Sequence, residues 1–322
     1  MKPLLIALAA IAQGQNPAPS QSAVQLPNTA APPKASPAAV APVPQIPFEP
    51  PKVLRIIREF IKPGKTSAHE RASMNAVRLL ARAKAPANFI GLSAVSGDEE
   101  VWFIESHDSF ASIEAADTFV GNSPALRWNL NQLEAQDAEL VSSTRRLLAV
   151  YRKDLSYRGD QLALRLPNTR YFSVVMVGLH PARDAEFSNI VGMVAATYEK
   201  VKSDQPLVVY QVVSGSAGLT YLFFSPMPSL QTMDAAAARG RAVREAMGEE
   251  NAAAMLKTSA EVTATTESLL FALNPRLSYV SREFAALDPD FWTPKPPPKP
   301  PVQPGTPDPS PAPGPPGPAA PK

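Results

Sequence analysis

The densest group of polar side chains in this sequence is the run Glu105-Ser106-His107-Asp108, which follows an apolar segment at residues 101–104. If the extended backbone continues through the run, Glu105 and His107 lie on the same face of a strand. A carboxylate and an imidazole placed in this way could hold a metal ion or relay a proton. The run also has a purely structural interpretation, in which it ends a strand and begins a helix with Asp108 or Ser109 as the N-cap.

A second group of charged side chains, Arg55, Arg58 and Glu59, lies in the first apolar segment of the chain. Arg55 and Glu59 share one face of the expected strand. If this face lines the space between two packed sheets, the two side chains form a polar pocket there; otherwise they are rim charges or an internal ion pair. No catalytic residue and no metal site stands out from the sequence. The candidate ligand-binding residues are Arg55, Glu59, Glu105, His107, Asp108 and Trp128.

The other histidines and tryptophans have structural interpretations. We expect His69 on the surface of a helix, and His180 in a loop, where it precedes a proline. Trp102 lies in an apolar segment and is expected in the core, as is Trp128, since an aromatic residue on a helix is usually buried. Trp292 is expected to pack the last folded segment against the preceding domain.

Several common classes of protein are disfavoured. The 322 residues contain no cysteine, which excludes disulfides, thiolate metal sites and cysteine nucleophiles. The sequence has no HExxH, GxSxG or P-loop motif, and no GxGxxG that opens a helix after a strand. The net charge is only +2, with both signs mixed along the chain, so no nucleic acid partner is expected.

The middle of the chain reads as a tandem repeat. The phrase Val95-Ser96-Gly97 recurs 118 residues later as Val213-Ser214-Gly215, and the same offset aligns the apolar residues 54–65 with 172–183. Later the offset is 122 residues. It aligns 147–157 with 269–279, in which both copies end in Leu-Ser-Tyr. The growth of the offset predicts about four extra residues in the second copy, between Met233 and Ser268.

Each copy has the order strand, helix, strand, turn, strand, helical region, strand. This βαββαβ order is ferredoxin-like, with Gly97 and Gly215 in the central hairpins. We name residues 53–158 the first unit and residues 170–293, which include a C-terminal extension, the second unit; residues 159–169 connect them. The predicted class is α+β, with two tandem ferredoxin-like units packed as an internal pseudo-dimeric α/β barrel that buries the second face of each sheet.

This layout resembles the dimeric α/β-barrel superfamily, which includes the antibiotic-biosynthesis monooxygenase-like and NIPSNAP-like domains, present here as a tandem duplication. The resemblance covers residues 53–280 and depends on element order rather than on a diagnostic motif. It implies one of several activities, because some members are cofactor-free oxygenases, some bind haem and some only bind small ligands. Trp128 and Asn129 resemble residues of haem-degrading members, but their spacing departs from that pattern, so the cofactor is left open.

Both ends of the chain are rich in proline. Residues 1–12 resemble a signal peptide, with Lys2 followed by an apolar stretch and an A-x-A cleavage pattern at residues 10–12. Residues 13–52 form a Pro/Ala-rich linker that we expect to be disordered. Residues 294–322 contain 15 of the 37 prolines and should populate polyproline II, either as a spacer or as a ligand for an aromatic-lined groove.

The sequence therefore predicts an exported protein, located in the periplasm or outside the cell. The main hypothesis is that it binds a small molecule or serves as a scaffold, and the sequence favours this hypothesis over an enzyme. One alternative is a cofactor-free or haem-using monooxygenase-like enzyme. Another is a cell-envelope protein that interacts through its proline-rich tail. We expect no transmembrane helix, because no apolar run reaches membrane length.

Overall fold

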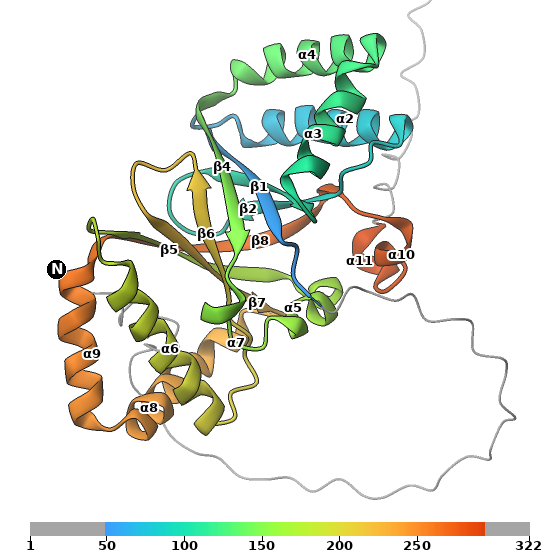
Figure 1. Cartoon of the computed structure of the whole chain (residues 1–322). Coiled ribbons are helices and arrows are strands. Elements are labelled where there is room, and N and C mark those ends of the chain that lie inside the picture. The colour runs from blue at the N-terminus through green and yellow to red at the C-terminus, as the bar shows by residue number, and fades with distance from the viewer. Residues whose placement is uncertain (1–48, 294–322) are drawn as a thin grey trace, which may run out of the picture.

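The computed structural model describes residues 49–293, so the predicted signal peptide, most of the linker and the proline-rich tail lie outside the described residues. The fold is α+β, with eight antiparallel strands that form a closed barrel and with helices on two opposite sides of it (Figure 1). Within the described part of the chain, no helix is both long and apolar enough to cross a membrane.

The two units have the predicted order of elements. The first unit contains β1 (Val53–Ile61), α2 (Thr66–Ala83), β2 (Phe89–Ala94), β3 (Glu100–His107), α3 (Phe110–Gly121), α4 (Pro124–Ala138) and β4 (Val141–Tyr151). The second contains β5 (Tyr171–Leu179), α6 (Asp184–Lys200), β6 (Val208–Ser214), β7 (Thr220–Met227), α7 (Gln231–Asp234), α8 (Ala236–Met247), α9 (Glu249–Val262) and β8 (Thr263–Tyr279). Between and after them lie α5 (Asp160–Arg165), α10 (Arg282–Ala285), α11 (Pro289–Trp292) and two short 3-10 turns.

The strand order around the barrel is β1-β3-β2-β8-β5-β7-β6-β4. Each unit therefore contributes one four-stranded sheet, β4-β1-β3-β2 or β8-β5-β7-β6, and both have the ferredoxin-like order. The sheets join at both edges, where β2 pairs with β8 and β4 pairs with β6. Edge strands expose unpaired N–H and C=O groups, and closing the barrel satisfies them.

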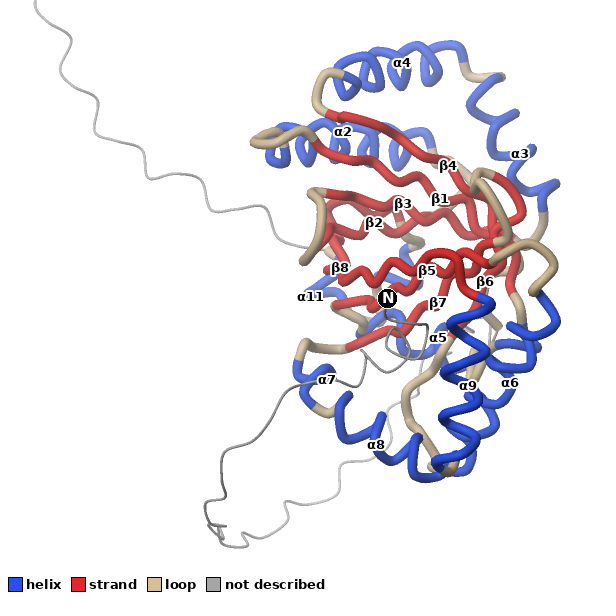
Figure 2. The backbone as a smooth tube through the Cα atoms, turned by 90° about the vertical axis from the view of Figure 1, so that its left-hand side faces the viewer, coloured by secondary structure: helices blue, strands red, loops and turns tan. Residues whose placement is uncertain are grey.

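Helices cover only the outer faces of the two sheets. Helices α2, α3 and α4 gather over the first unit, and α6, α8 and α9 lie over the second, on the far side of the barrel (Figures 1 and 2). In each strand, every second side chain therefore points into the barrel, and the side chains between them point toward the helices. This arrangement explains why both faces of each sheet are largely apolar in sequence.

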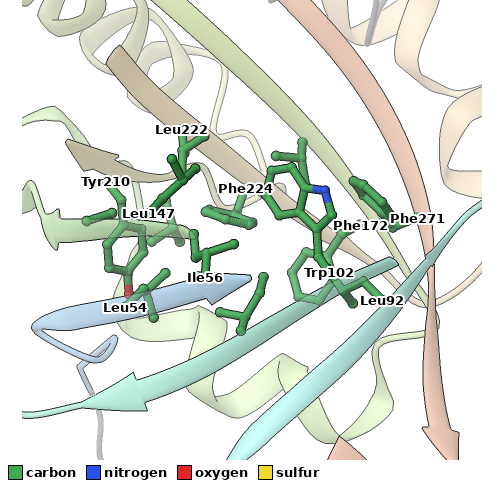
Figure 3. Packing of buried hydrophobic residues seen from close by; sticks show 14 of the residues in the cluster. Leu54, Ile56, Leu92, Trp102, Leu147, Phe172, Tyr210, Leu222, Phe224 and Phe271 are labelled. Atoms are coloured by element: carbon green, nitrogen blue, oxygen red, sulfur yellow. The ribbon is translucent and has the colours of Figure 1, made fainter. Parts of the chain in front are cut away.

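The barrel interior is a packed core and not a pore. Side chains from both units meet in it. For example, the ring centroids of Trp102 and Phe271 are 5.1 Å apart (Figure 3). Leu54 and Ile56 point inward from β1, so the alternate residues Arg55 and Glu59 point outward, toward the helices. The space between the two sheets is thus filled, and it is not the pocket that Arg55 and Glu59 were considered to line. Trp102 is fully buried, as predicted.

One ion pair is buried inside the barrel. The guanidinium of Arg58 donates to the Glu100 carboxylate, and both residues are less than 5% exposed. The indole Nε1 of Trp102 donates to the same carboxylate. From the opposite strand, the sulfur of Met176 lies 3.6 Å from Nη1 of Arg58. Met176 follows Arg58 by 118 residues, so the corresponding positions of β1 and β5 meet across the interior.

The strand register corrects one detail of the predicted repeat. Ile90 pairs with Ile104 in the first unit, and Val208 pairs with Phe224 in the second. The offset is therefore 118 residues for β2 and β6 but 120 for β3 and β7. Two of the extra residues thus lie in the β6–β7 hairpin, and placing all four after Met233 was wrong.

The last strands keep the predicted offset of 122 residues. Ile56 faces Leu147 in the first unit, and Val174 faces Leu269 in the second. With the offset of 120 for the third strand, the counterpart of Glu105 is Ser225, and the counterpart of His107 is Met227. The charged run of β3 therefore still has no charged equivalent in the second unit.

The two hairpin glycines have positive φ, as expected, at 90° for Gly97 and 95° for Gly215. Their surroundings differ. A Cβ added to Gly97 would meet nothing within 4 Å, whereas on Gly215 it would lie 2.0 Å from the carbonyl oxygen of Arg146. Gly215 sits where the hairpin of the second unit crosses β4 of the first.

We expect Gly215→Ala to be much more destabilising than Gly97→Ala. Positive φ alone should lower the free energy of unfolding by about 1–2 kcal/mol in both variants. At Gly215 the clash with the Arg146 backbone adds to this loss, because backbone cannot move aside as a side chain can. Urea unfolding of both variants measures the difference, and equal losses would contradict the close approach at Gly215.

Trp292 packs the last described segment against the second unit, as predicted. Its side chain is buried, and its Nε1 donates to the carbonyl oxygen of Pro167 at 2.9 Å. The ring packs edge-on against Phe284, and α11 contacts β8 of the second unit. The C-terminal extension is therefore fixed both to the connector and to the barrel.

Candidate functional site

A cavity of about 480 Å³ lies in the first unit, between the outer face of the sheet and the helices α2, α3 and α4. Its walls are mostly apolar, with side chains such as Leu80, Phe89, Phe103 and Leu133. Three of the predicted ligand-binding residues line it, namely Arg55, Glu59 and Glu105. The strand alternation correctly placed Arg55 and Glu59 on one face of β1, and Glu105 lies opposite Arg55 on the neighbouring β3. The helices lie above that face.

The cavity exists because α2 carries small side chains where α6 carries large ones. Helix α2 begins at Thr66 and helix α6 begins 118 residues later, at Asp184, so residues of the two helices correspond at this offset. Four buried residues of α6 fill the space above the second sheet: Phe187, Ile190, Val191 and Val194. Their counterparts in α2 are His69, Ala72, Ser73 and Ala76. The smaller set leaves unfilled volume between helix and sheet, and the last three residues line it.

At one end of the cavity, Arg55 is held by two carboxylates. Its Nε donates to Glu105 at 2.5 Å, and its Nη1 donates to Asp117 of α3 at 2.6 Å. Burial lowers the pKa of Arg55, but the hydrogen bonds to Glu105 and Asp117 outweigh burial, and the net pKa is raised. The ion pair considered between Arg55 and Glu59 is therefore not formed, because Arg55 pairs with Glu105 and Asp117 instead.

His107 lies behind this ion pair. Its Nε2 is 3.4 Å from Oε1 of Glu105, so the two side chains share a face as predicted. Its Nδ1 is 3.3 Å from the hydroxyl of Ser112 in α3. His107 is buried and does not line the cavity, and its Nε2 has no hydrogen-bond partner.

Asp108 and Trp128 do not belong to the site. Asp108 is exposed, and the N-cap of α3 is Ser109, whose hydroxyl accepts from the backbone N–H of Ser112. Trp128 is 63% exposed on α4, so its assignment to the core was wrong, and it does not line the cavity. Helix α4 turns Leu126 inward instead, and Trp128, two positions on, faces outward.

The other end of the cavity holds Glu59, His69 and Asp137. His69 was expected on the surface, but it is only 1% exposed, because the face of α2 that carries it packs on the sheet. Its Nε2 lies 2.8 Å from Oε2 of Glu59 and 3.6 Å from Oδ2 of Asp137, near the end of α4. Burial raises the pKa of Asp137 to about 6; His69 opposes this rise and Glu59 adds to it.

Asp117, Asp137 and the buried position of His69 were missed in the sequence. Both aspartates come from helices far from β1 along the chain, and the apolar pattern of α4 is weak. A signal for His69 was present, since the offset of 118 residues aligns it with Phe187, a residue of the clear apolar stripe of α6.

The second unit has a smaller cavity of about 260 Å³, lined by α6, α8 and α9. Val194, Tyr198 and Ser225 line it, and they are the counterparts of Ala76, Leu80 and Glu105 around the first cavity. The two cavities therefore lie at equivalent places. In the second, larger side chains and an uncharged residue in place of Glu105 leave a narrower and differently charged space.

The histidines of this chain do not fit haem, the cofactor that the sequence resemblance implies for some members. Of the three histidines, His69 and His107 lie near the large cavity, but neither lines it. Their Nε2 atoms, which would ligate the iron, face Glu59 and Glu105. His180 is exposed at the end of β5 in the other unit. The loop position predicted for His180 is therefore confirmed.

Comparisons with known proteins give structural neighbours only. No family model and no curated protein matches the chain. An anthrone oxidase-like protein is 15% identical, with a TM-score of 0.42 over 69% of this chain and 91% of its own. A mutant chlorite dismutase from Candidatus Nitrospira defluvii is 9% identical, with a TM-score of 0.41 over 70% and 92%. A candidate monooxygenase from Lactobacillus acidophilus is 10% identical, with a TM-score of 0.40 over 69% and 93%. Likenesses at this level of identity and TM-score identify no activity.

Proposed function

We propose that this chain is a small-molecule-binding protein and that its site is the cavity of the first unit. The ligand has an apolar body and one hydrogen-bond-donating or cationic group. The observation that carries the proposal is a cavity of about 480 Å³ with largely apolar walls and two carboxylates at one end. Pockets of this size and composition are typical of sites for small organic ligands.

The charges around the cavity determine which polar group fits. Five carboxylates and two guanidiniums line it. Arg55 is paired with Glu105 and Asp117, and Arg146 with Glu134. Among residues 49–293, neither Glu59 nor Asp137 forms an ion pair with lysine or arginine. Carboxylates accept hydrogen bonds and repel anions, so a hydroxyl or ammonium group fits this end of the cavity and a carboxylate does not.

Three naphthalene derivatives test this preference on protein treated with a chelator. We expect 2-naphthol and 1-naphthylmethylammonium to bind, and 2-naphthoate to bind at least about tenfold more weakly, a difference of about 1.4 kcal/mol. Isothermal titration calorimetry measures the three affinities. The double variant Glu59→Gln/Asp137→Asn should reduce the difference in affinity between 2-naphthoate and the other two ligands. The control is Glu134→Gln, because Glu134 is exposed and already paired with Arg146. Equal affinity for the acid and the alcohol would contradict the proposed ligand class.

A second candidate function is a cofactor-free oxygenase of the monooxygenase-like group. Glu59 favours it, because this carboxylate faces the cavity while His69 holds its other side at 2.8 Å. Such a pair could remove the proton of a bound quinol before it reacts with oxygen. Oxygen uptake with 1,4-naphthoquinol, corrected for autoxidation, is the test. Uptake that depends on Glu59 supports an enzyme, and uptake at the autoxidation rate argues for a binding protein.

We further propose that the two units are a tandem duplication of one dimeric α/β-barrel unit. The matched strand orders, strand registers and cavity positions support this origin. We also propose, from residues 1–12, that the protein is exported to the periplasm or the cell exterior. From residues 294–322 we propose that the proline-rich tail binds an envelope partner. Cell fractionation with and without residues 1–12 tests export, and comparing the partners of the full chain with those of a chain lacking 294–322 tests the tail.

A further inference from the structure

We propose that Glu59, His69 and Asp137 bind a divalent transition-metal ion in the wall of the large cavity. The three residues come from β1, α2 and the end of α4, and each offers one ligand atom. These atoms all lie within 4.8 Å of one another. The inference concerns the same cavity as the proposed function but does not depend on any organic ligand.

The spacing of the three ligand atoms is close to that of a metal site. Ligands bound at about 2.0–2.1 Å in a tetrahedral site lie about 3.4 Å from one another. The distance from Nε2 of His69 to Oδ2 of Asp137 is 3.6 Å, and that to Oε2 of Glu59 is 2.8 Å. The shorter contact is a hydrogen bond. An ion that replaced the proton of this bond would increase the distance between Nε2 and Oε2 by about half an ångström.

The charge of the cluster also calls for a cation. Two carboxylates lie beside one imidazole, and each has a side chain that is only 18% exposed. Within the described residues, no lysine or arginine pairs with either of them. Oδ1 of Asp137 is buried and has no hydrogen-bond partner. Uncompensated buried charge is costly, and a divalent ion would neutralise both carboxylates at once.

The ligand set indicates which ions fit. One imidazole and two carboxylates suit Zn²⁺, Mn²⁺, Co²⁺ or Fe²⁺ better than Cu⁺, which selects sulfur ligands, or Ca²⁺, which takes six to eight oxygens. Glu59 and Asp137 line the cavity, whereas His69 lies behind them. The remaining coordination positions of the ion would therefore face the cavity, as in metal sites that accept water or substrate.

The test uses the full chain, stripped of metal with a chelator and then dialysed against Zn²⁺ or Co²⁺. We expect one Zn²⁺ per chain by elemental analysis, and the visible absorption of protein-bound Co²⁺. Loss of an outer partner of a metal ligand costs roughly 10- to 100-fold in affinity, so loss of a ligand itself should cost more. The variants are Glu59→Gln, His69→Gln and Asp137→Asn.

The matched controls are Glu105→Gln and His107→Gln, which alter the other imidazole–carboxylate pair on the same face of the sheet. Both should retain the ion. Asp137→Asn serves if the buried His69→Gln variant fails to fold, as judged by circular dichroism. The proposal is overturned if the wild type takes up no ion, or if Asp137→Asn and His107→Gln bind Zn²⁺ equally well. Neither result bears on the binding of naphthalene derivatives, which is measured without metal.

Discussion

Replacing Ala72 with Ile and Ala76 with Val should strongly weaken binding of 2-naphthol while the protein stays folded. The second unit carries Ile190 and Val194 at these positions, where they are buried against the sheet. In the first unit the added carbon atoms would occupy the cavity. Binding should weaken by at least about tenfold in calorimetry. The free energy of unfolding should change little, because filling a cavity offsets the cost of about 1–3 kcal/mol that overpacking imposes elsewhere.

The control for this pair is Ala81→Ile on the same helix. Ala81 is exposed, so this variant tests the effect of a branched residue in α2 without changing the cavity. It should bind 2-naphthol as the wild type does. If the double variant also binds with unchanged affinity, the ligand is not in this cavity and the proposed site is wrong.

Replacing Arg58 with Met should produce a large loss of stability. The change leaves the Glu100 carboxylate in the core with the indole N–H of Trp102 but without its guanidinium. Removing one partner of a buried ion pair typically costs about 3–5 kcal/mol. Met is the natural replacement, because Met176 is the counterpart of Arg58 in the second unit and already contacts it.

A second substitution should recover part of this loss. In Arg58→Met/Glu100→Gln both charges of the buried pair are absent and Trp102 keeps a hydrogen-bond acceptor, so the double variant should unfold at higher urea than Arg58→Met alone. Glu267, the other carboxylate that pairs with Arg58, has a side chain that is 47% exposed, so water can solvate it in both variants. Arg183→Met, which breaks the exposed pair with Glu186, is the control and should cost less than about 1 kcal/mol. An equal cost for Arg58→Met and Arg183→Met would refute the account of the buried pair.

Much of the fold was predictable because it depends on local order and on apolar periodicity. The β1 and β5 segments and the stripe of Phe187, Ile190 and Val194 on α6 are visible in sequence, and the repeated phrases fix their correspondence. The closed barrel follows from sheets with two apolar faces. What failed was the register of β7, since the two extra residues of its hairpin leave no trace in the apolar pattern.

The site was predictable only where one strand determines it. Alternation places Arg55 and Glu59 on one face of β1, and Glu105 joins them from the neighbouring strand. Whether that face meets the helices or the opposite sheet could not be decided, because both faces of the sheet are buried. Asp117 and Asp137 reach the cavity from helices whose packing depends on contacts distant in sequence, and Trp128 was misplaced for the same reason.

The most direct test of the binding proposal is a crystal structure of the protein soaked with 2-naphthol. The account predicts the naphthalene ring between the first sheet and α2, α3 and α4, against Phe103 and Leu80. It also predicts the hydroxyl within hydrogen-bond distance of Glu59 or Asp137. A structure in which this cavity is empty while 2-naphthol occupies the smaller cavity of the second unit, or binds only at the surface, would contradict it.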